Sequence, residues 1–77
     1  MDLKQVLTDI ARAIVDNPDS VTVSETVEGN DVTLVLKVAD EDTGMVIGRK
    51  GRIAKAIRSL MKVAGNSVGK RVIVEIE

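Results

Sequence analysis

The chain has 77 residues, of which 44% are hydrophobic and 30% charged, and its formal net charge is −1. Residues 1–77 are expected to form one domain with a modest core and no deep enzyme cleft, since a domain of this size buries roughly 60% of its unfolded surface. The absence of cysteine, histidine and aromatic residues excludes disulfides, thiolate or imidazole chemistry, and stacking of a base on an aromatic ring.

The chain shows no sign of a membrane or export segment. No apolar run approaches the ~20 residues that a membrane span needs. The first residues, Met1–Lys4, lack the charged-then-apolar pattern of a signal peptide. We therefore expect a cytoplasmic protein.

The first half of the chain predicts a helix and a β-hairpin. Apolar residues with helical spacing predict a helix over residues 2–16. Asn17-Pro18 ends it, because the residue before proline avoids the helical conformation. Alternating stretches at 21–27 and 32–38 flank the turn Glu28–Asp31 and predict two antiparallel strands.

The second half predicts two helices and a strand. A short helix is expected over Glu41–Ile47, with Asp40 as its N-cap and Gly48 ending it in the left-handed conformation. A longer helix is expected from about Arg52 to Ala64, with Gly65-Asn66 as its stop. Alternation over residues 72–76 predicts a third strand.

These elements predict an α+β fold in the order α-β-β-α-α-β. The second and third strands are joined by a long helical connection, so they are expected to be parallel neighbours with a right-handed crossover. The three-stranded mixed sheet would carry three helices on one face. The other face, with Thr22, Thr33, Lys37 and Glu75, would meet water.

Charge is divided unevenly along the chain. The segment Thr43–Val74 contains eight of the eleven basic residues and no acidic one, so its charge is +8, and the remainder carries −9. A local basic surface attracts a polyanion even when the whole protein is slightly acidic. Charge alone leaves a merely solvated basic helix face equally open.

The loop Gly48-Arg49-Lys50-Gly51 is the most informative stretch. Gly48 allows a positive φ, and Gly51 removes a Cβ where another backbone could approach. Amides at the start of the next helix are expected to face outward, where the helix dipole favours negative charge. Arg49, Lys50 and Arg52 add three cations, and together these features predict a phosphate-backbone binding site.

The residues around this loop are open to two interpretations. The aliphatic Val46, Ile47 and Ile53 belong either to the core or to a shallow apolar groove against which bases lie. On the long helix, one side is basic or polar: Arg52, Lys55, Arg58, Ser59 and Lys62.

The opposite side of the long helix is apolar. Ile53, Ile57, Leu60 and Ala64 are expected to face the core. Ala54, Ala56, Met61 and Val63 widen the apolar arc to about half the circumference. Such an arc indicates either deep burial or contact with another protein chain.

Catalysis and metal binding have little support. The run Gly44–Lys50 is one residue short of a P-loop and lacks its Gly-Lys-Ser/Thr ending, and the dinucleotide fingerprint would need glycine where Val46 stands. The hydroxyls of Ser59 and Ser67 have no histidine to activate them. The acidic run Asp40–Asp42 suits a cap and an acidic first turn better than a ligand set, so we expect no cofactor and no metal.

The run Val46–Gly51 resembles the VIGxxGxxI signature of the KH domain, with the closing position falling on Ala54. The predicted element order resembles the type II, or prokaryotic, KH arrangement over the whole chain. The segment Gly44–Leu60 further resembles the small bacterial single-KH proteins of the KhpA type. That resemblance implies a single-stranded RNA-binding protein acting as an RNA chaperone or post-transcriptional regulator.

The resemblance also implies contacts and partners. Gly48, Arg49, Lys50 and Gly51 would contact the sugar-phosphate backbone of about four nucleotides. Ile47 and Ala54 would shape the groove, with Arg52 and Lys55 beside it. Self-association and a heterodimer with a larger KH protein of the KhpB, or Jag, type are implied as well. The main rival is a KH-fold interaction or dimerisation module with little RNA affinity of its own.

Overall fold

The computed structural model describes residues 1–77. None of its helices combines the length and apolar character needed to cross a membrane. The predicted order of helices and strands is confirmed, with three short 3-10 turns between them. The main elements are α1 (Leu3–Ile14), β1 (Thr22–Glu28), β2 (Asp31–Lys37), α2 (Thr43–Ile47), α3 (Arg52–Ser67) and β3 (Arg71–Ile76).

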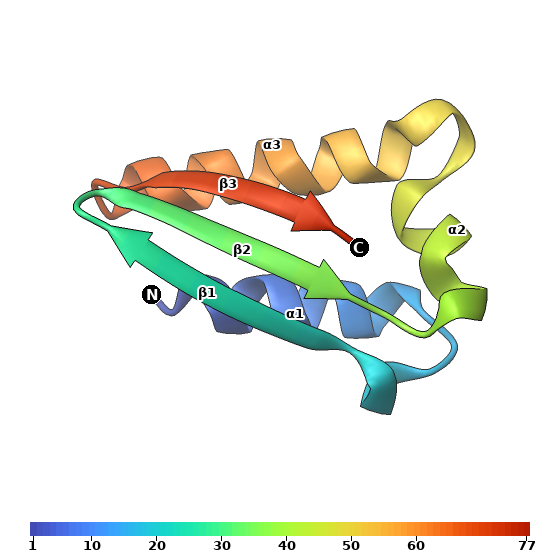
Figure 1. The fold of residues 1–77 in the computed structure, drawn as a ribbon. Helices are drawn as coiled ribbons and strands as arrows, with labels where there is room; N and C mark the ends of the chain where they lie inside the picture. The colour runs from blue at the N-terminus through green and yellow to red at the C-terminus, as the bar shows by residue number, and fades with distance from the viewer.

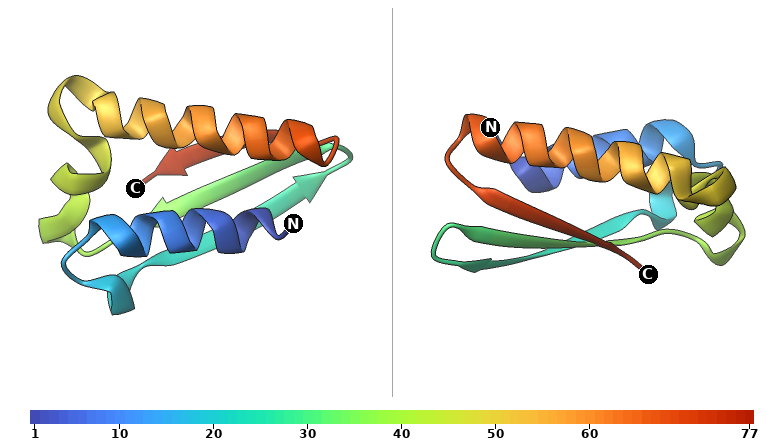
Figure 2. Two further views of the ribbon diagram at one scale, coloured as in Figure 1. Left: turned by 180° about the vertical axis from the view of Figure 1, so that it is seen from behind. Right: turned by 90° about the horizontal axis from the view of Figure 1, so that it is seen from above.

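The three strands form one mixed sheet in the order β1-β2-β3, with β1 antiparallel and β3 parallel to the central β2 (Figure 1). Both pairings are as predicted. The long helices α1 and α3 lie side by side across one face of the sheet, and α2 closes the end of that face (Figure 2). The fold is therefore two layers, helices on sheet, with the other sheet face uncovered.

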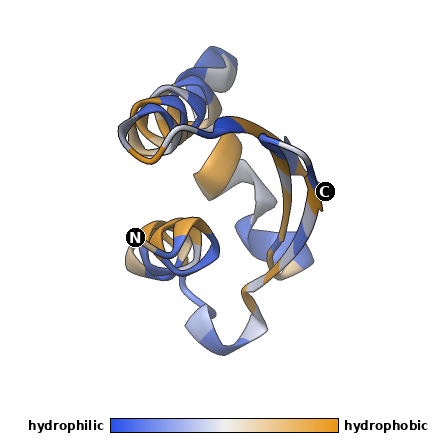
Figure 3. Ribbon diagram, turned by 90° about the vertical axis from the view of Figure 1, so that its left-hand side faces the viewer, coloured by the Kyte–Doolittle hydropathy of each residue, from blue (hydrophilic) through white to orange (hydrophobic).

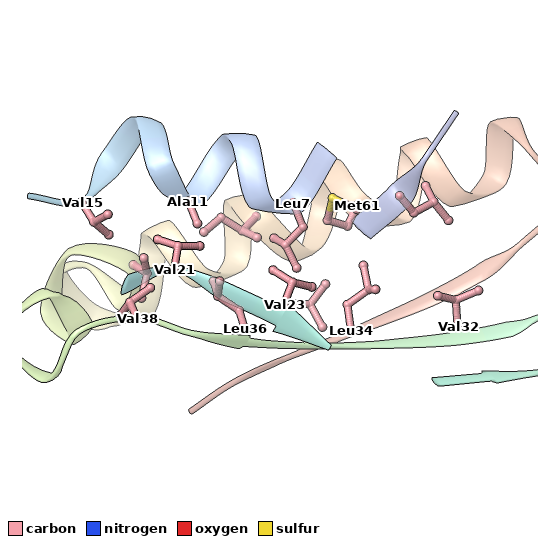
Figure 4. Packing of buried hydrophobic residues seen from close by; sticks show 14 residues of the cluster. Leu7, Ala11, Val15, Val21, Val23, Val32, Leu34, Leu36, Val38 and Met61 are labelled. Atoms are coloured by element: carbon pink, nitrogen blue, oxygen red, sulfur yellow. The ribbon is translucent and has the colours of Figure 1, made fainter. Parts of the chain in front are cut away.

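The core fills the space between these layers. Figure 3, an end-on view, shows that space with hydrophobic segments on the elements around it. Leu34 and Leu36 of β2 point toward Leu7 of α1 and Met61 of α3, and none of the four side chains is exposed (Figure 4). Burial of a side chain of this kind contributes about 1.5–3 kcal/mol relative to leaving it exposed.

The uncovered sheet face is largely polar, as predicted. Thr22, Lys37 and Glu75 are exposed, and Thr33 is half-buried. An apolar residue is also present there, because Ile73 pairs with Thr33 on the neighbouring strand and is 42% exposed.

The predicted core-facing stripe of α3 is correct for Ile57 and wrong for Ile53 and Leu60, while Ala64 is half-buried against the core. Its buried residues are Ala54, Ile57, Met61 and Gly65, whereas Leu60 is 56% exposed. Two of the buried residues, Ala54 and Gly65, are small, and at Gly65 the helix lies too close to β3 for a Cβ. Hydrophobicity alone favoured the larger aliphatic residues for the core, and it does not record this close approach.

Gly65 illustrates that close approach. The predicted stop at Gly65-Asn66 is wrong, since α3 continues to Ser67. A Cβ on Gly65 would lie 2.5 Å from Val72 Cγ2 and 2.9 Å from the carbonyl oxygen of Lys70. Gly69, at a φ of +71°, reverses the chain, and the Lys70 amide donates to the Gly65 carbonyl at 2.8 Å.

Replacing Gly65 by alanine is therefore expected to lower the free energy of unfolding by about 1–3 kcal/mol, because a packed core resists an added methyl group. The measurement is urea-induced unfolding followed by circular dichroism. Gly44→Ala is the matched control, since Gly44 is also helical and a Cβ there would meet nothing within 4 Å. This control is expected to stabilise the protein by about 0.5–1 kcal/mol. Equal effects of the two variants would contradict the close packing.

The predicted N-cap at Asp40 is also wrong. Residues Asp40–Asp42 form a 3-10 turn, and neither this turn nor α2 has a side-chain cap at its start. Asp42 is instead 1% exposed, and its Oδ2 accepts hydrogen bonds from the backbone amide of Asn17 at 2.9 Å and from Asn17 Nδ2 at 3.0 Å. This carboxylate ties the segment after α1 to the start of α2.

Asp42→Ala is expected to lower the free energy of unfolding by about 1–3 kcal/mol, because the part-buried donors of Asn17 lose their acceptor. Thermal or urea unfolding measures the loss. Asp40→Ala, which removes an exposed carboxylate from the same turn, should change stability by less than about 0.5 kcal/mol. A loss of similar size in both variants would show that the Asn17 contacts do not matter.

Candidate functional site

The loop Gly48–Gly51 joins α2 to α3 at the end of the molecule away from the β1–β2 turn (Figure 1). Its two glycines are half-buried, whereas Arg49 and Lys50 are exposed. The loop breaks the helical path instead of continuing it, since the backbone at Gly48 has φ +75° and ψ 175°. The predicted bend with two exposed cations between two helices is confirmed.

Three of the four loop residues have a positive φ. Gly48 lies at +75° and Gly51 at +74°, as their freedom from a Cβ permits. Lys50, at +56°, is the only non-glycine residue of the chain in this region. Holding an L-residue there costs about 1 kcal/mol, so the loop keeps a lysine where glycine would be easier to fold.

Gly48 has a second role that sequence reasoning missed. A Cβ on Gly48 would overlap Ile53 Cγ1 and would lie 2.9 Å from Ile53 Cβ and 3.0 Å from its backbone nitrogen. Ile53, which is 37% exposed, thus packs its side chain against the loop backbone. At Gly51, by contrast, a Cβ would meet nothing within 4 Å, so the space in front of this residue is open.

The amides at the start of α3 are not all free, which corrects the expectation that they face outward. The Gly51 amide donates to the Gly48 carbonyl at 3.2 Å, and the Arg52 amide donates to the Arg49 carbonyl. Both bonds belong to the 3-10 turn of the loop itself. The amides of Arg49 and Lys50, in the middle of the loop, are therefore the better candidates to meet an external acceptor.

The remaining predicted site residues divide by exposure. Arg52 and Lys55 are exposed on the first turns of α3, and Ile47 is 39% exposed at the end of α2. Ala54 is only 5% exposed, so it offers little surface for direct contact, and its role in shaping the groove stays a prediction.

The electrostatic environment at the start of α3 favours binding of an anion. Its N-cap, Gly51, provides no side-chain hydrogen bond, and its first turn contains no acidic residue. The partial positive charge of this helix end therefore lacks an internal counter-charge, and a negative group placed there gains about 0.3–1 kcal/mol. Arg49, Lys50 and Arg52 lie at or next to this helix end.

No other region offers a comparable site. A cavity of about 380 Å³ lies at the opposite end of the fold, near the β1–β2 turn, and the chain has no cluster of three carboxylates placed to hold a metal ion. The cavity is therefore separate from the loop. It is lined by Met1, Asp2, Leu3, Glu25, Val27, Val32, Val68 and Lys70.

The fold has a counterpart among solved structures. It is similar to part of the crystal structure of Era in complex with MgGDPNP and nucleotides 1506–1542 of 16S ribosomal RNA, with a TM-score of 0.58 and 17% identity. The match covers 96% of this chain and 28% of that one. At this identity the likeness shows the fold alone.

Similarity in sequence extends over almost the whole chain. The chain is 54% identical to the RNA-binding protein KhpA of Clostridium acetobutylicum, over 96% of this chain and 99% of that protein. It is 53% identical to the protein of the same name from Caldanaerobacter subterraneus, covering 94% and 96% of the two chains. For the protein of Aquifex aeolicus the identity is 40%, covering 96% and 94%.

The model of the KhpA/KhpB KH domain matches residues 4–76. The match includes the glycine-bounded loop and every helix and strand apart from the first residue of α1. The chain belongs to the KhpA/KhpB family of KH-domain proteins.

Proposed function

We propose that this protein binds single-stranded RNA by gripping the sugar-phosphate backbone with the loop Gly48–Gly51. The proposal depends mainly on the conformation of Lys50, which is exposed next to Arg49 and has a positive φ. The space in front of the neighbouring Gly51 is open. The names of the curated relatives support it, since each is an RNA-binding protein. In this proposal the chain acts in the cytoplasm as an RNA chaperone or post-transcriptional regulator, without catalysis.

The grip would depend on charge and backbone shape more than on bases. Arg49, Lys50, Arg52 and Lys55 would neutralise phosphates of about four nucleotides. The exposed side chain of Ile47 offers an aliphatic surface for a base. Because the chain has no aromatic residue, each base lacks the ~1–3 kcal/mol that stacking on a ring provides. We therefore expect modest affinity and weak base preference from one copy.

Binding of this kind has a characteristic salt dependence. If about four phosphates are neutralised, the logarithm of the association constant should fall with the logarithm of the salt concentration at a slope of roughly −3. Fluorescence anisotropy of a labelled single-stranded RNA at several salt concentrations measures the slope. A slope near zero would contradict an electrostatic grip.

A second function is favoured by an exposed apolar stripe on α3, defined here as Ile53, Ala56, Leu60 and Val63. These residues recur at helical spacing on one side of α3, and Leu60 and Val63 are 56% and 68% exposed. Exposed apolar stripes of this kind mark contacts between proteins. The stripe supports a homodimer, or a heterodimer with a KH protein of the KhpB type.

The two functions are separable by crosslinking. RNA recovered covalently with the tagged chain from ultraviolet-irradiated cells would favour the RNA-binding function, and protein partners without RNA would favour the interaction module. The loop and the stripe on α3 have no residue in common. They touch only where Ile53 of the stripe packs against Gly48 of the loop. One copy can therefore carry both functions.

A further inference from the structure

Basic residues continue along α3 well beyond the loop. We define the basic strip as Lys55, Arg58 and Lys62, which are all exposed. At 100° per residue their directions fall within about 60° of one another, so they share one side of the helix. Lys55 and Lys62 are seven residues apart, which is about 10 Å along the axis.

The strip opposes the stability of its own helix. Arg58 has like-charged neighbours at three and four residues, Lys55 and Lys62, and such pairs destabilise a helix. The basic residues of α3 begin in its first turn, and its last turn has none, which is the reverse of what the helix dipole favours.

Helix α1 shows part of the arrangement that stability favours, although Lys4 lies in its first turn. It is capped by Asp2, whose Oδ1 accepts from the Gln5 amide at 3.1 Å, and it has Arg12 in its last turn. α3 has neither this side-chain cap nor a basic residue in its last turn, and an external anion bound at the strip would relieve the repulsion among its basic residues.

Arg58 joins the strip to the sheet. Its Nε donates to the carbonyl oxygen of Val74 in β3 at 3.3 Å. β3 is an edge strand. The amides of Arg71 and Glu77 donate toward Asn30 and Leu36 on the β2 side, so alternate residues such as Val74 direct their polar groups to the open edge. The Arg58 guanidinium is thus fixed at this edge, between α3 and β3.

We propose that the RNA track extends past the loop along the basic strip, so that the ligand is a single strand longer than the four nucleotides that the loop grips. Lys62 then contacts a phosphate that a four-nucleotide strand does not reach. The strip begins at Lys55, beside the loop, and its positive charge complements a continuing phosphate backbone. This inference rests on the proposed function.

The test compares Lys62→Ala with Lys37→Ala, which removes an exposed lysine from the uncovered sheet face. Binding of labelled oligouridines of four and eight nucleotides is measured by anisotropy at several salt concentrations. Lys62→Ala is expected to weaken binding of the longer strand about 5- to 10-fold and to reduce its salt slope by about 0.7, with the shorter strand unaffected. Lys37→Ala should leave both strands unaffected.

Two outcomes would overturn the extended track. One is an equal effect of Lys62→Ala and Lys37→Ala on the longer strand. The other is an equal loss for both strands on changing Lys62. Failure of the loop function has a different signature, because Arg49→Asp with Lys50→Asp would then leave binding of the four-nucleotide strand unchanged. Comparing the variants on the same strand removes the advantage that a longer strand has in offering more binding registers.

Discussion

Replacing Arg49 and Lys50 together by aspartate is expected to weaken binding of single-stranded RNA about 100-fold or more. Two charge-assisted contacts to phosphate are lost, each of about 1.5–3 kcal/mol, and two negative charges are placed beside the phosphates. The fold should persist, since both side chains are exposed and aspartate tolerates the positive φ of position 50 better than most residues. Anisotropy titration measures the affinity, and urea unfolding checks the fold.

The matched control separates local contacts from overall charge. Lys4→Glu with Lys37→Glu makes the same change in net charge at exposed positions outside the segment 43–74. This control should reduce affinity only weakly, because surface charges farther than about 10 Å are screened at 0.1 M salt. Should the control and the loop variant lose affinity equally, or should the loop variant bind as well as the wild type, the loop is not the binding site.

Replacing Leu60 and Val63 together by glutamate is expected to dissociate a dimer formed through α3, raising its dissociation constant about 100-fold or more. In a two-fold dimer both copies present the same stripe. Four apolar side chains would therefore lose burial, each of which contributes about 1.5–3 kcal/mol when complete. The four new charges would also face one another. Sedimentation equilibrium over a range of protein concentrations measures the change.

Val27→Glu controls for the loss of exposed apolar surface as such. Val27 is 52% exposed on β1, away from the stripe, so its replacement should leave self-association unchanged. A wild-type chain that stays monomeric at every concentration would contradict the homodimer. So would a dimer that persists in the Leu60 and Val63 variant.

The sequence predicted the order and pairing of the elements because these depend on local pattern. Alternation defined the three strands and helical spacing defined α1 and α3, and every element lies within a few residues of its expected range. The parallel pairing of β2 with β3 followed from the length of the helical connection between them. No information about distant contacts was needed for either result.

The rotation of α3 could not be predicted in the same way. Its apolar arc is wide, so several orientations bury a similar hydrophobic area. The structure buries the side on which Gly65 fits against Val72, a contact between elements that neither segment encodes alone. Helical spacing therefore predicted the helix and the burial of Ile57, but not the full set of buried residues.

The loop, like the helices and strands, was predicted from local sequence pattern. The contacts that hold the loop and its neighbouring segments in place were not predicted. Paired glycines around two cations indicate a bend in any context. The packing of Ile53 on Gly48 and the carboxylate of Asp42 at Asn17 join residues whose partners the sequence does not specify. In the sequence, the three adjacent acidic residues Asp40–Asp42 cannot be told apart by their pattern. Only the fold shows that Asp42 is the buried one.

The crowding at Gly48 limits how this loop can change. Any side chain at position 48 would collide with Ile53, and the positive φ of Gly51 disfavours other residues there. Within the loop, positions 49 and 50 are thus the two whose side chains can be substituted without changing the backbone conformation. At position 50 glycine, asparagine or aspartate would suit the backbone better than lysine. At this position the residues that best suit the backbone conformation are neutral or acidic, whereas binding of phosphate favours a basic residue. A neutral or acidic loop with the same backbone would therefore be less strained than this one.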